Sequence, residues 1–372
     1  MLVRLISGIA LVVAVCAGCA TRPVNERITA VDPAHGYRLE LGLANRSNND
    51  PRTVLVLAFS GGGTRAAALS YGVLEALRRK EVVVDGQRRT LLDEVDAITG
   101  VSGGSFTALA YALHGDRLFS EYEDRFLKRD VQGALLGRAF NPVYWPKLVG
   151  GSYGRSELAA DYYDEILFEG ATYGDLLKKN APITVVAGTD LSTGARIEFS
   201  QTVFDVMCSD LNTVRLARAS ATSSAVPIAL SPVTFDNYGG TCGFEFHQRT
   251  VYEMSNPSTR QRPAERALMR VREQRSLERS KERPYLHLVD GGVADNLALR
   301  GVVEALELLE ASPASREILG LDRVDRIAII IVNAHATPSV DWDRREEPPA
   351  WSHRSCRPRV FRSICTRTSR FS

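Results

Sequence analysis

Three short segments carry residue types that can together cleave an ester. Residues 100–104 read Gly-Val-Ser-Gly-Gly, residues 60–65 read Ser-Gly-Gly-Gly-Thr-Arg, and residues 290–292 read Asp-Gly-Gly. Ester cleavage needs a nucleophile, a base that takes its proton, and N–H donors that face the oxyanion of the tetrahedral intermediate. The segments offer a serine, a carboxylate and a run of unobstructed amides, and they therefore predict a serine hydrolase.

The serine of the first segment, Ser102, is predicted to lie on a strand-to-helix turn. Residues 95–99 are typical of a short buried strand, and residues 106–113 of the start of an apolar helix. A Gly-x-Ser-x-Gly turn strains the backbone of the serine, lifts its hydroxyl above the sheet, and directs the next helix N-terminus at the atom it attacks. Ser102 is the candidate nucleophile, although this pattern also occurs in ordinary tight turns.

The glycines Gly61, Gly62 and Gly63 follow an apolar strand and begin a helix. Because they have no side chains, their N–H groups can converge on an anion, as an oxyanion hole requires. Arg65 can reach an anionic substrate or form a structural salt bridge. The segment also fits a relaxed dinucleotide fingerprint, with Asp85 near the place of a ribose-binding acid, but that reading leaves the serine and aspartate motifs unexplained.

Asp290 ends the apolar segment 286–289, and we expect its carboxylate to emerge at the same sheet edge as Ser102. The ordinary pKa of aspartate, about 3.9, is too low for an effective general base, so burial has to raise it. Alternatively, Asp290 caps the helix that begins near Asp295. His335 also leaves open a Ser-His-Asp triad in the chain order of α/β-hydrolases.

Strands and helices alternate along the chain. Residues 53–59 form an apolar run, and residues 66–77 follow with helical periodicity. The same alternation returns several times up to residue 332, which predicts an α/β fold with a mostly parallel central sheet covered by helices. Residues 243–284 are a charged insertion in which residues 264–281 can form a helix; we expect a solvated excursion, with a membrane-facing element as the alternative. Residues 140–149 are aromatic and aliphatic; we expect core, with an acyl pocket or a lid as the alternative.

The N-terminal region predicts export. Arg4 and the apolar residues 5–15 are typical of a signal peptide, and the apolar run is too short for a permanent membrane span. Within the signal segment 1–19, Ala-Gly-Cys resembles a bacterial lipobox whose Cys19 is acylated. The alternative is cleavage after another small residue such as Ala20, which gives a soluble protein.

The remaining segments divide the chain further. Residues 20–52 are polar and predict a tether that leads to a hydrolase domain at 53–340. Export into an oxidising compartment favours a disulfide between Cys208 and Cys242, with two buried free thiols as the alternative. Residues 341–372 form an atypical basic tail that is assigned no catalytic role. The formal charge of +2 and the composition give no indication of nucleic-acid binding.

The three motifs, in this order and spacing, resemble the patatin-like phospholipase family over about residues 53–334. Two further segments agree with that family, residues 188–194 (Gly-Thr-Asp-Leu-Ser-Thr-Gly) and residues 219–227 (Ala-Ser-Ala-Thr-Ser-Ser-Ala-Val-Pro). The resemblance implies a three-layer α/β/α fold and a Ser–Asp dyad without histidine, in which Ser102 is the nucleophile and Asp290 the base.

The resemblance also implies that Gly61, Gly62 and Gly63, with the Gly103 amide, bind the oxyanion, and that Arg65 is the loop arginine of the family. We therefore expect a lipid acyl hydrolase that works without a metal or cofactor on membrane lipid or another acyl ester. The signal segment and the lipobox predict that it lies in the bacterial outer membrane or periplasm. A non-catalytic envelope lipid-binding protein that kept the fold is the alternative from a different class.

Overall fold

The computed structural model describes residues 22–44, 50–84, 86–149, 152–256, 258 and 264–335. The strands within them are β1 (Thr53–Phe59), β2 (Glu81–Val84), β3 (Gln87–Thr90), β4 (Val95–Gly100), β5 (Ile183–Asp190), β6 (Arg196–Glu198), β7 (Val233–Asp236), β8 (Tyr285–Val289) and β9 (Arg326–Val332). The α-helices are α2 (Leu39–Ala44), α3 (Gly63–Arg79), α4 (Gly103–His114), α5 (Leu118–Tyr122), α6 (Val131–Phe140), α7 (Trp145–Val149), α8 (Arg155–Tyr163), α9 (Tyr173–Leu176), α10 (Gln201–Val206), α11 (Leu216–Ser223), α12 (Gln248–Ser255), α13 (Glu265–Arg275), α14 (Gly292–Asp295), α15 (Arg300–Ala311) and α16 (Pro313–Ile318).

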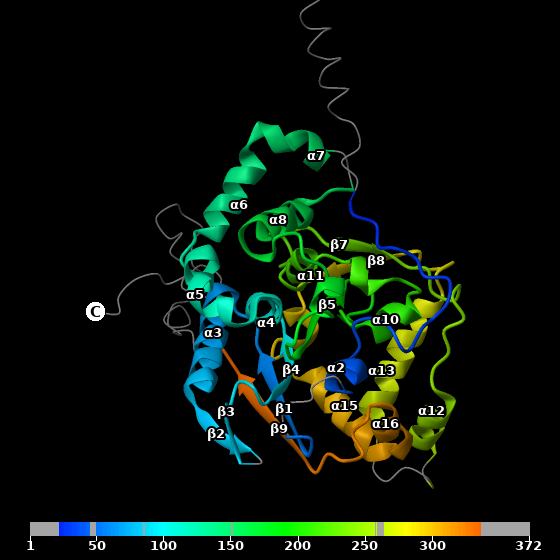
Figure 1. Cartoon of the computed structure of the whole chain (residues 1–372). Coiled ribbons are helices and arrows are strands. Elements are labelled where there is room, and N and C mark those ends of the chain that lie inside the picture. Colours follow the sequence, from blue (N-terminus) through cyan, green and yellow to red (C-terminus); the bar gives the residue numbers. More distant parts are fainter. Residues whose placement is uncertain are drawn as a thin grey trace, which may run out of the picture.

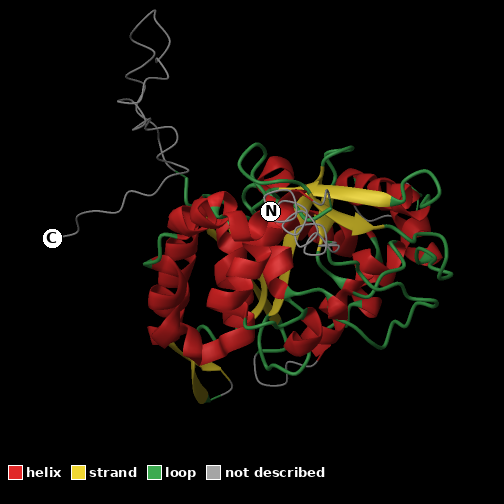
Figure 2. Cartoon of the chain, turned by 90° about the horizontal axis from the view of Figure 1, so that it is seen from above, coloured by secondary structure: helices red, strands yellow, loops and turns green. Residues whose placement is uncertain are grey.

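A mostly parallel sheet forms the centre of the molecule. Its strand order is β7-β8-β5-β4-β1-β9, and β6 pairs with β5 outside this path. The strands β9, β1, β4 and β5 run parallel to their neighbours in that series. Figure 1 shows α3, α4 and α5 on one side of the sheet and α2, α13 and α15 on the other, and the view from above in Figure 2 also shows helices on both sides. The predicted α/β fold is confirmed.

The strands next to the site form because their residues are apolar and buried on both faces. Leu57 and Phe59 of β1 and Ile98 of β4 are fully buried. A strand covered by helices on both faces reads as a continuous apolar run, since neither face meets water. β1 ends at the glycines of residues 61–63, and β4 ends at Gly100, so two neighbouring parallel strands deliver both glycine turns to the same edge of the sheet.

The direction of β8 differs from the sequence prediction of parallel strands. β8 runs antiparallel to β5, and the two strands pair only over Thr189 with Val289 and Asp190 with Leu288. Because this overlap lies at the carboxyl end of β5, the end of β8 still lies at the edge where β4 ends. Asp290 therefore reaches the expected edge by a different route.

The segment predicted as a tether packs against the domain where the structure describes it. Arg22 forms an ion pair with Asp236 at 2.6 Å, and Arg38 forms one with Asp205 at 2.7 Å. The buried Tyr37 hydroxyl accepts a hydrogen bond from the Thr184 amide. Residues 22–44 of the predicted tether are therefore held on the domain through polar side chains that find partners there.

The charged insertion also packs against the domain, unlike the solvated excursion that the sequence predicts. It contains α12 and α13, and α13 packs against α15 and against β6. Arg270 of α13 is buried, where it donates to the carbonyl oxygen of Arg196 and pairs with Glu198 at 3.3 Å. Arg196 in turn pairs with the buried Glu304 of α15 at 2.5 Å. The insertion is held by paired charges together with a small apolar cluster around Ala264 and Ala267.

The apolar residues between 140 and 149 do not lie in the core as expected. Phe140, Val143 and Trp145 are exposed on α6, on the 3₁₀ turn Pro142–Tyr144 and on α7. α6 packs on the core through the face that carries Val131, Ala134 and Leu135, so Phe140 is left outside. No helix among the described residues is long and apolar enough to cross a membrane.

A disulfide joins Cys208 and Cys242, whose Cα atoms lie 5.5 Å apart. It links the end of α10 to the loop that follows β7, across 34 residues of sequence. This is the pairing that the sequence analysis expects. A crosslink of this length stabilises the fold mainly by reducing the freedom of the unfolded chain.

Candidate active site

Ser102 occupies the turn between β4 and α4 with the strained backbone expected of a nucleophile elbow. Its φ is 49° and its ψ is −121°, a conformation that residues with a side chain rarely adopt. Its backbone N–H donates to the Ser223 hydroxyl at 2.9 Å. The N-terminus of α4 follows directly, so its positive end favours negative charge developing beside the serine oxygen.

The hydroxyl of Ser102 donates a hydrogen bond to Asp290. The distance from Ser102 Oγ to Asp290 Oδ2 is 2.9 Å, although the residues are 188 positions apart in the chain. The other carboxylate oxygen, Asp290 Oδ1, accepts the Gly292 amide at 2.7 Å. The carboxylate is thus fixed by its own turn and points one oxygen at the serine, as a base that removes this proton must.

Two residues that the sequence analysis did not single out hold these turns together. The Ser223 carbonyl oxygen accepts the Gly291 amide at 3.0 Å, while its hydroxyl accepts the Ser102 amide. Thr189 Oγ1 donates to the Asp290 carbonyl oxygen at 2.8 Å. Both residues lie in the two further segments that carry the family resemblance, and that membership is the signal that points to them.

Burial raises the pKa of Asp290 from its ordinary 3.8 to about 6. Removal from water disfavours the charged carboxylate, and the hydrogen bonds from Gly292 and Ser102 only partly offset this effect. The sequence analysis requires such a shift for general-base chemistry. With a pKa near 6, most Asp290 carboxylates are ionised at pH 7 and still basic enough to accept a proton from serine.

We expect kcat/KM for ester hydrolysis to follow the ionisation of Asp290. The base works only when it is deprotonated, so activity rises with pH through about 6 and reaches a plateau above about 7. At pH 5 the rate should be about tenfold below the plateau, because about one carboxylate in ten is then ionised. Initial rates from pH 4.5 to 9, with circular dichroism as a control for unfolding, measure this. A profile flat down to pH 4.5 contradicts it.

The glycine loop presents N–H groups beside Ser102, but not all three that were predicted. The Gly61 amide donates to the Asn296 carbonyl oxygen at 2.9 Å, so it is not available to an oxyanion. Within the described residues, the amides of Gly62, Gly63 and Gly103 donate to no protein acceptor. These three groups can serve as oxyanion donors, and the prediction is corrected at Gly61.

Positions 61 and 103 also need glycine because other atoms lie too close for a side chain. A Cβ on Gly103 would lie 2.0 Å from the Gly63 carbonyl oxygen, and a Cβ on Gly61 would lie 2.3 Å from Asn296 Oδ1. Real Cβ atoms do not approach other atoms so closely. The glycine loop and the serine turn therefore come into contact through their main chains, which brings the amides of both next to the nucleophile.

Arg65 is exposed and has no hydrogen-bond or ion-pair partner among the residues that the structure describes. One of its terminal nitrogens lies 3.5 Å from the position that a Cβ on Gly62 would take. The structural salt bridge that was the alternative for Arg65 is therefore not present here. Within the described part of the chain, its guanidinium has no charged partner, and it lies beside the glycine loop.

His335 does not take part in the serine–aspartate contact. It is exposed, and its only described hydrogen bond runs from its backbone N–H to Asn333. Asp295 accepts the Arg300 amide at the start of α15 at 2.7 Å, and Asp290 accepts the Gly292 amide at the start of α14 in addition to its contact with Ser102. Over the described ranges, no group of three or more histidine, cysteine or acidic side chains is arranged to hold a metal ion.

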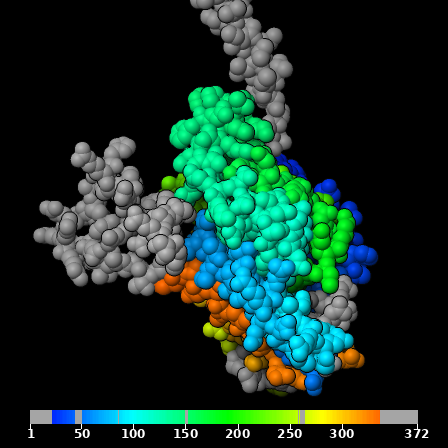
Figure 3. Space-filling model, turned by 60° about the vertical axis from the view of Figure 1, so that its left-hand side comes forward, coloured from blue at the N-terminus to red at the C-terminus, as the bar shows by residue number. Residues whose placement is uncertain are grey.

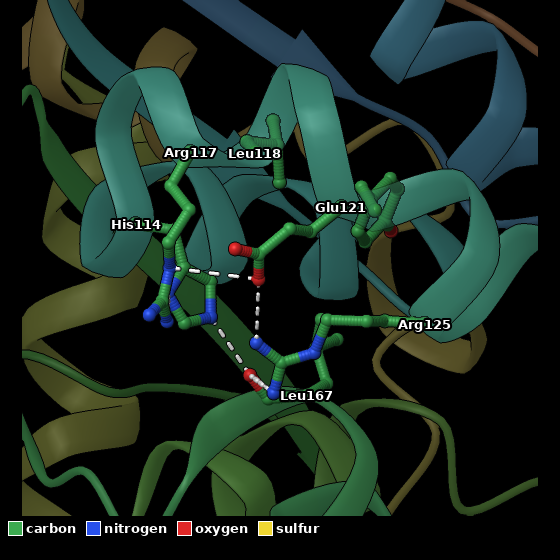
Figure 4. A pocket seen from close by; sticks show the side chains of 7 residues that line it. His114, Arg117, Leu118, Glu121, Arg125 and Leu167 are labelled. Atoms are coloured by element: carbon green, nitrogen blue, oxygen red, sulfur yellow. Dashed lines mark hydrogen bonds and ion pairs between the residues drawn. The ribbon is translucent and has the colours of Figure 1, made fainter.

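A small hollow lies at the opposite end of α4 from Ser102 (Figure 4). Since α4 has 12 residues, the two ends are about 18 Å apart. Ion pairs fill the hollow: Arg125 pairs with Glu121 at 3.0 Å, and Arg117 with Glu121 at 3.6 Å. Burial lowers the pKa of His114, whose Nε2 bonds to the Leu167 carbonyl oxygen. The ion pairs and hydrogen bonds at this hollow connect neighbouring helices, and the hollow is not part of the active site.

Cys19, the signal segment 1–19, Asp85 and the basic tail 341–372 lie outside the described residues. The acylation of Cys19 therefore stays a prediction.

Comparison with known proteins identifies the family. The family model described as patatin-like phospholipase matches residues 57–303, more than half of the chain. Among solved structures, human GIVD cytosolic phospholipase A2 in complex with methyl gamma-linolenyl fluorophosphonate is 18% identical with a TM-score of 0.34, over 50% of this chain and 32% of that one. The same human enzyme without the inhibitor is 19% identical with a TM-score of 0.30, over 50% and 31% of the two chains.

The aligned region thus spans about a third of the length of those structures. No curated protein matches the chain. On the match to the family model, the chain belongs to the patatin-like phospholipase family.

Proposed function

We propose that the protein is a lipid acyl hydrolase that cleaves carboxylic esters through a Ser102–Asp290 dyad. The observation that carries this proposal is the hydrogen bond of 2.9 Å from Ser102 Oγ to a buried carboxylate whose pKa is raised to about 6. Such a pair provides the nucleophile and the base in one contact. Membership in the patatin-like phospholipase family supports a lipid ester as the substrate.

In the proposed reaction, Asp290 takes the hydroxyl proton while Ser102 Oγ attacks the ester carbonyl carbon. The carbonyl oxygen becomes an oxyanion, and the amides of Gly62, Gly63 and Gly103 donate to it. The intermediate collapses to an acyl-enzyme as the alcohol leaves with the proton held by Asp290. Water then attacks the acyl carbon and gives a proton to Asp290. The bond from the acyl carbon to Ser102 Oγ breaks, the fatty acid leaves, and Asp290 returns the proton to Ser102 Oγ.

Arg65 supports a substrate with an anionic group close to the ester. Its guanidinium lies beside the glycine loop and has no acidic partner among the described residues, and a cation placed there can pair with a phosphate of a phospholipid. A Ser-His-Asp mechanism through His335 has no support from the contacts of the described residues. A purely lipid-binding role leaves the strained backbone of Ser102 and the raised pKa of Asp290 without a purpose.

We also propose that the protein is exported and anchored through an acylated Cys19 in the bacterial envelope, at the outer membrane or in the periplasm. The support is the N-terminal sequence alone. An anchored enzyme works where phospholipid is abundant, which agrees with the proposed substrate class. Palmitate labelling that is lost in Cys19→Ser supports the anchor, and labelling that survives in this variant excludes it.

A lipid-panel hydrolysis assay tests the activity. Wild-type protein should release fatty acid from at least one class of phospholipid or simple ester, and Ser102→Ala should lower that release to the uncatalysed rate plus a residual contribution of binding and oxyanion donors. A thermal melt shows that the variant is folded. Fatty-acid release by Ser102→Ala at the wild-type rate contradicts the proposal.

A further inference from the structure

Large apolar side chains are exposed on α6, on the turn Pro142–Tyr144, on α7 and on the loop that follows α11, and we call this group the apolar crown. The exposed fractions are 59% for Leu136, 75% for Phe140, 77% for Val143, 50% for Trp145 and 95% for Ile228. Single exposed apolar residues are ordinary, but a group of this size on neighbouring elements marks a contact surface.

The crown exists because α6 is apolar on two faces. Val131, Ala134 and Leu135 face the core, at the spacing of one helical face. Leu136 and Phe140 are four residues apart and share the face that remains in water. The chain then turns through Pro142–Tyr144 into α7, and this turn adds Val143 and Trp145 to the same projecting end of the molecule (Figure 3).

Ile228 belongs to the crown through the loop that follows α11. The exposed Arg155 at the start of α8 donates to the Ile228 carbonyl oxygen at 3.0 Å, and the Ser156 amide donates to Ser231 Oγ at 3.1 Å. Ile228 has a φ of +75°, which is strained for a β-branched residue. The same loop is tied to the active site, because the Ala225 carbonyl oxygen accepts the Asp290 amide.

Three cations lie beside the crown, and two of them have acidic partners. Between residues 131 and 149 the sequence contains Arg138 and Lys147 and no acidic residue. Arg138 pairs with Glu165 at 2.5 Å, and the half-exposed Lys147 pairs with Asp161 at 3.9 Å. Arg155 has no carboxylate partner in the described part of the chain. Apolar side chains flanked by cations fit the boundary between acyl chains and anionic headgroups, and a tryptophan there adds an amphipathic ring.

The N-terminal side of the described chain lies at the same end of the molecule. The Arg22 amide donates to Ser152 Oγ at 3.4 Å, a few residues after α7, and Figure 1 shows this start of the described chain beside α7. Cys19 is three residues before Arg22, so the chain can place it at most about 11 Å away. An acylated Cys19 would therefore hold the protein to a membrane with the crown already at the surface.

We propose that the apolar crown docks on the surface of an anionic lipid bilayer, with Phe140, Val143, Trp145 and Ile228 inserted at the level of the upper acyl chains. The loop that contains Ile228 also contacts the Asp290 turn, so the docked bilayer would lie on the side of the molecule where this loop is exposed. The docking itself needs no ester hydrolysis, so it does not depend on the proposed activity.

Quenching of Trp145 fluorescence tests the proposal in the full chain. Trp342 and Trp351 are replaced by phenylalanine so that Trp145 is the remaining tryptophan, and Ser102→Ala prevents hydrolysis of the vesicles. The probe is vesicles of phosphatidylethanolamine and phosphatidylglycerol with brominated acyl chains. Trp145 emission should shift to the blue and be quenched by bromine near the headgroups.

Substitutions then separate the crown from the anchor. Phe140→Ser with Val143→Ser and Ile228→Ser should abolish the quenching and lower vesicle affinity at least about tenfold in a Cys19→Ser background. Val83→Ser is the matched control, because Val83 is 69% exposed on β2, at the end of the molecule opposite α7 in Figure 1. Protein that sediments with vesicles while Trp145 stays unquenched overturns the proposal. A dimer in analytical ultracentrifugation whose formation shifts Trp145 emission to the blue without vesicles also overturns it.

Discussion

Replacing Asp290 by asparagine is expected to lower kcat for ester hydrolysis by about 1,000-fold or more while leaving the fold intact. Asparagine can still accept the Gly292 amide, but it cannot take the proton of Ser102. General-base catalysis contributes a factor of roughly 10² to 10⁴ to the rate. Removing one member of a catalytic unit costs nearly as much activity as removing all of them. Steady-state kinetics on a soluble ester, with wild type and Asp290→Asn at pH 8, measure the loss.

His335→Ala is the matched control for this experiment. The contacts of Asp290 predict that it keeps nearly the wild-type rate, whereas a Ser-His-Asp triad predicts a loss as large as that of Asp290→Asn. A severe loss in His335→Ala with a near-normal Asp290→Asn contradicts the dyad.

The stability of Asp290→Asn provides a second control. The folded protein raises the pKa of Asp290 from 3.8 to about 6, so the folded state binds this proton more strongly than the unfolded state does. The resulting stability is fully present below about pH 3.8 and is lost as the pH rises through about 6. At pH 8 Asp290→Asn should therefore melt at a higher temperature than wild type, with the difference fading near pH 4. A lower melting temperature at pH 8 would show that the asparagine disturbs the site in another way.

Replacing Gly103 by alanine is expected to lower kcat by about 100-fold or more. The new Cβ would lie 2.0 Å from the Gly63 carbonyl oxygen and 2.9 Å from the Gly63 nitrogen. Both are main-chain atoms, so the glycine loop has to move away from the serine turn. That movement separates the amides of Gly62 and Gly63 from the Gly103 amide, and loss of one oxyanion donor alone costs about 10² to 10³ in kcat.

Gly72→Ala is the matched control, because a Cβ at this position of α3 meets nothing within 4 Å. Alanine in an exposed helix interior is favoured over glycine by about 1 kcal/mol, so this variant should be slightly more stable and fully active. Kinetics and thermal melts of both variants separate a local steric effect from general destabilisation. An active Gly103→Ala means that the loop and the turn are not held together as described.

Much of the site could be predicted because its chemistry depends on local motifs. The Gly-x-Ser-x-Gly turn predicts the strained backbone of Ser102, and an apolar run that ends in Asp-Gly-Gly predicts where the Asp290 strand ends. Both predictions need only the residues next to the functional group. The alternation of apolar runs and helical periodicity likewise predicts β1, α3, β4 and α4 within a few residues.

Other features depend on contacts that a local pattern does not encode. The run Tyr285–Val289 has the same appearance whichever way the strand runs, so the antiparallel pairing of β8 was not visible. The Gly61 amide is removed from the oxyanion hole by the carbonyl oxygen of Asn296, more than two hundred residues away in sequence. The polar segment before β1 and the charged insertion pack on the domain because the buried Arg38 and Arg270 pair with Asp205 and Glu198, and charge composition alone does not reveal these pairs.

The sequence analysis expects the apolar residues of α6 and α7 in the core, and this expectation is wrong for a different reason. An apolar run indicates that water is avoided, and in most proteins the core satisfies this preference. Here α6 already buries one apolar face against the core, and Phe140 and its neighbours are left outside. The same sequence feature therefore points to a second apolar environment, which we propose is the bilayer.

Mass spectrometry of the protein after reaction with a fluorophosphonate tests the central claim most directly. A fluorophosphonate traps an activated serine as a covalent adduct, and peptide mapping locates it. The Ser102–Asp290 dyad predicts one adduct per chain on Ser102, blocked in Ser102→Ala and strongly slowed in Asp290→Asn. An adduct on a different residue, or full labelling of folded Asp290→Asn at the wild-type rate, contradicts the account.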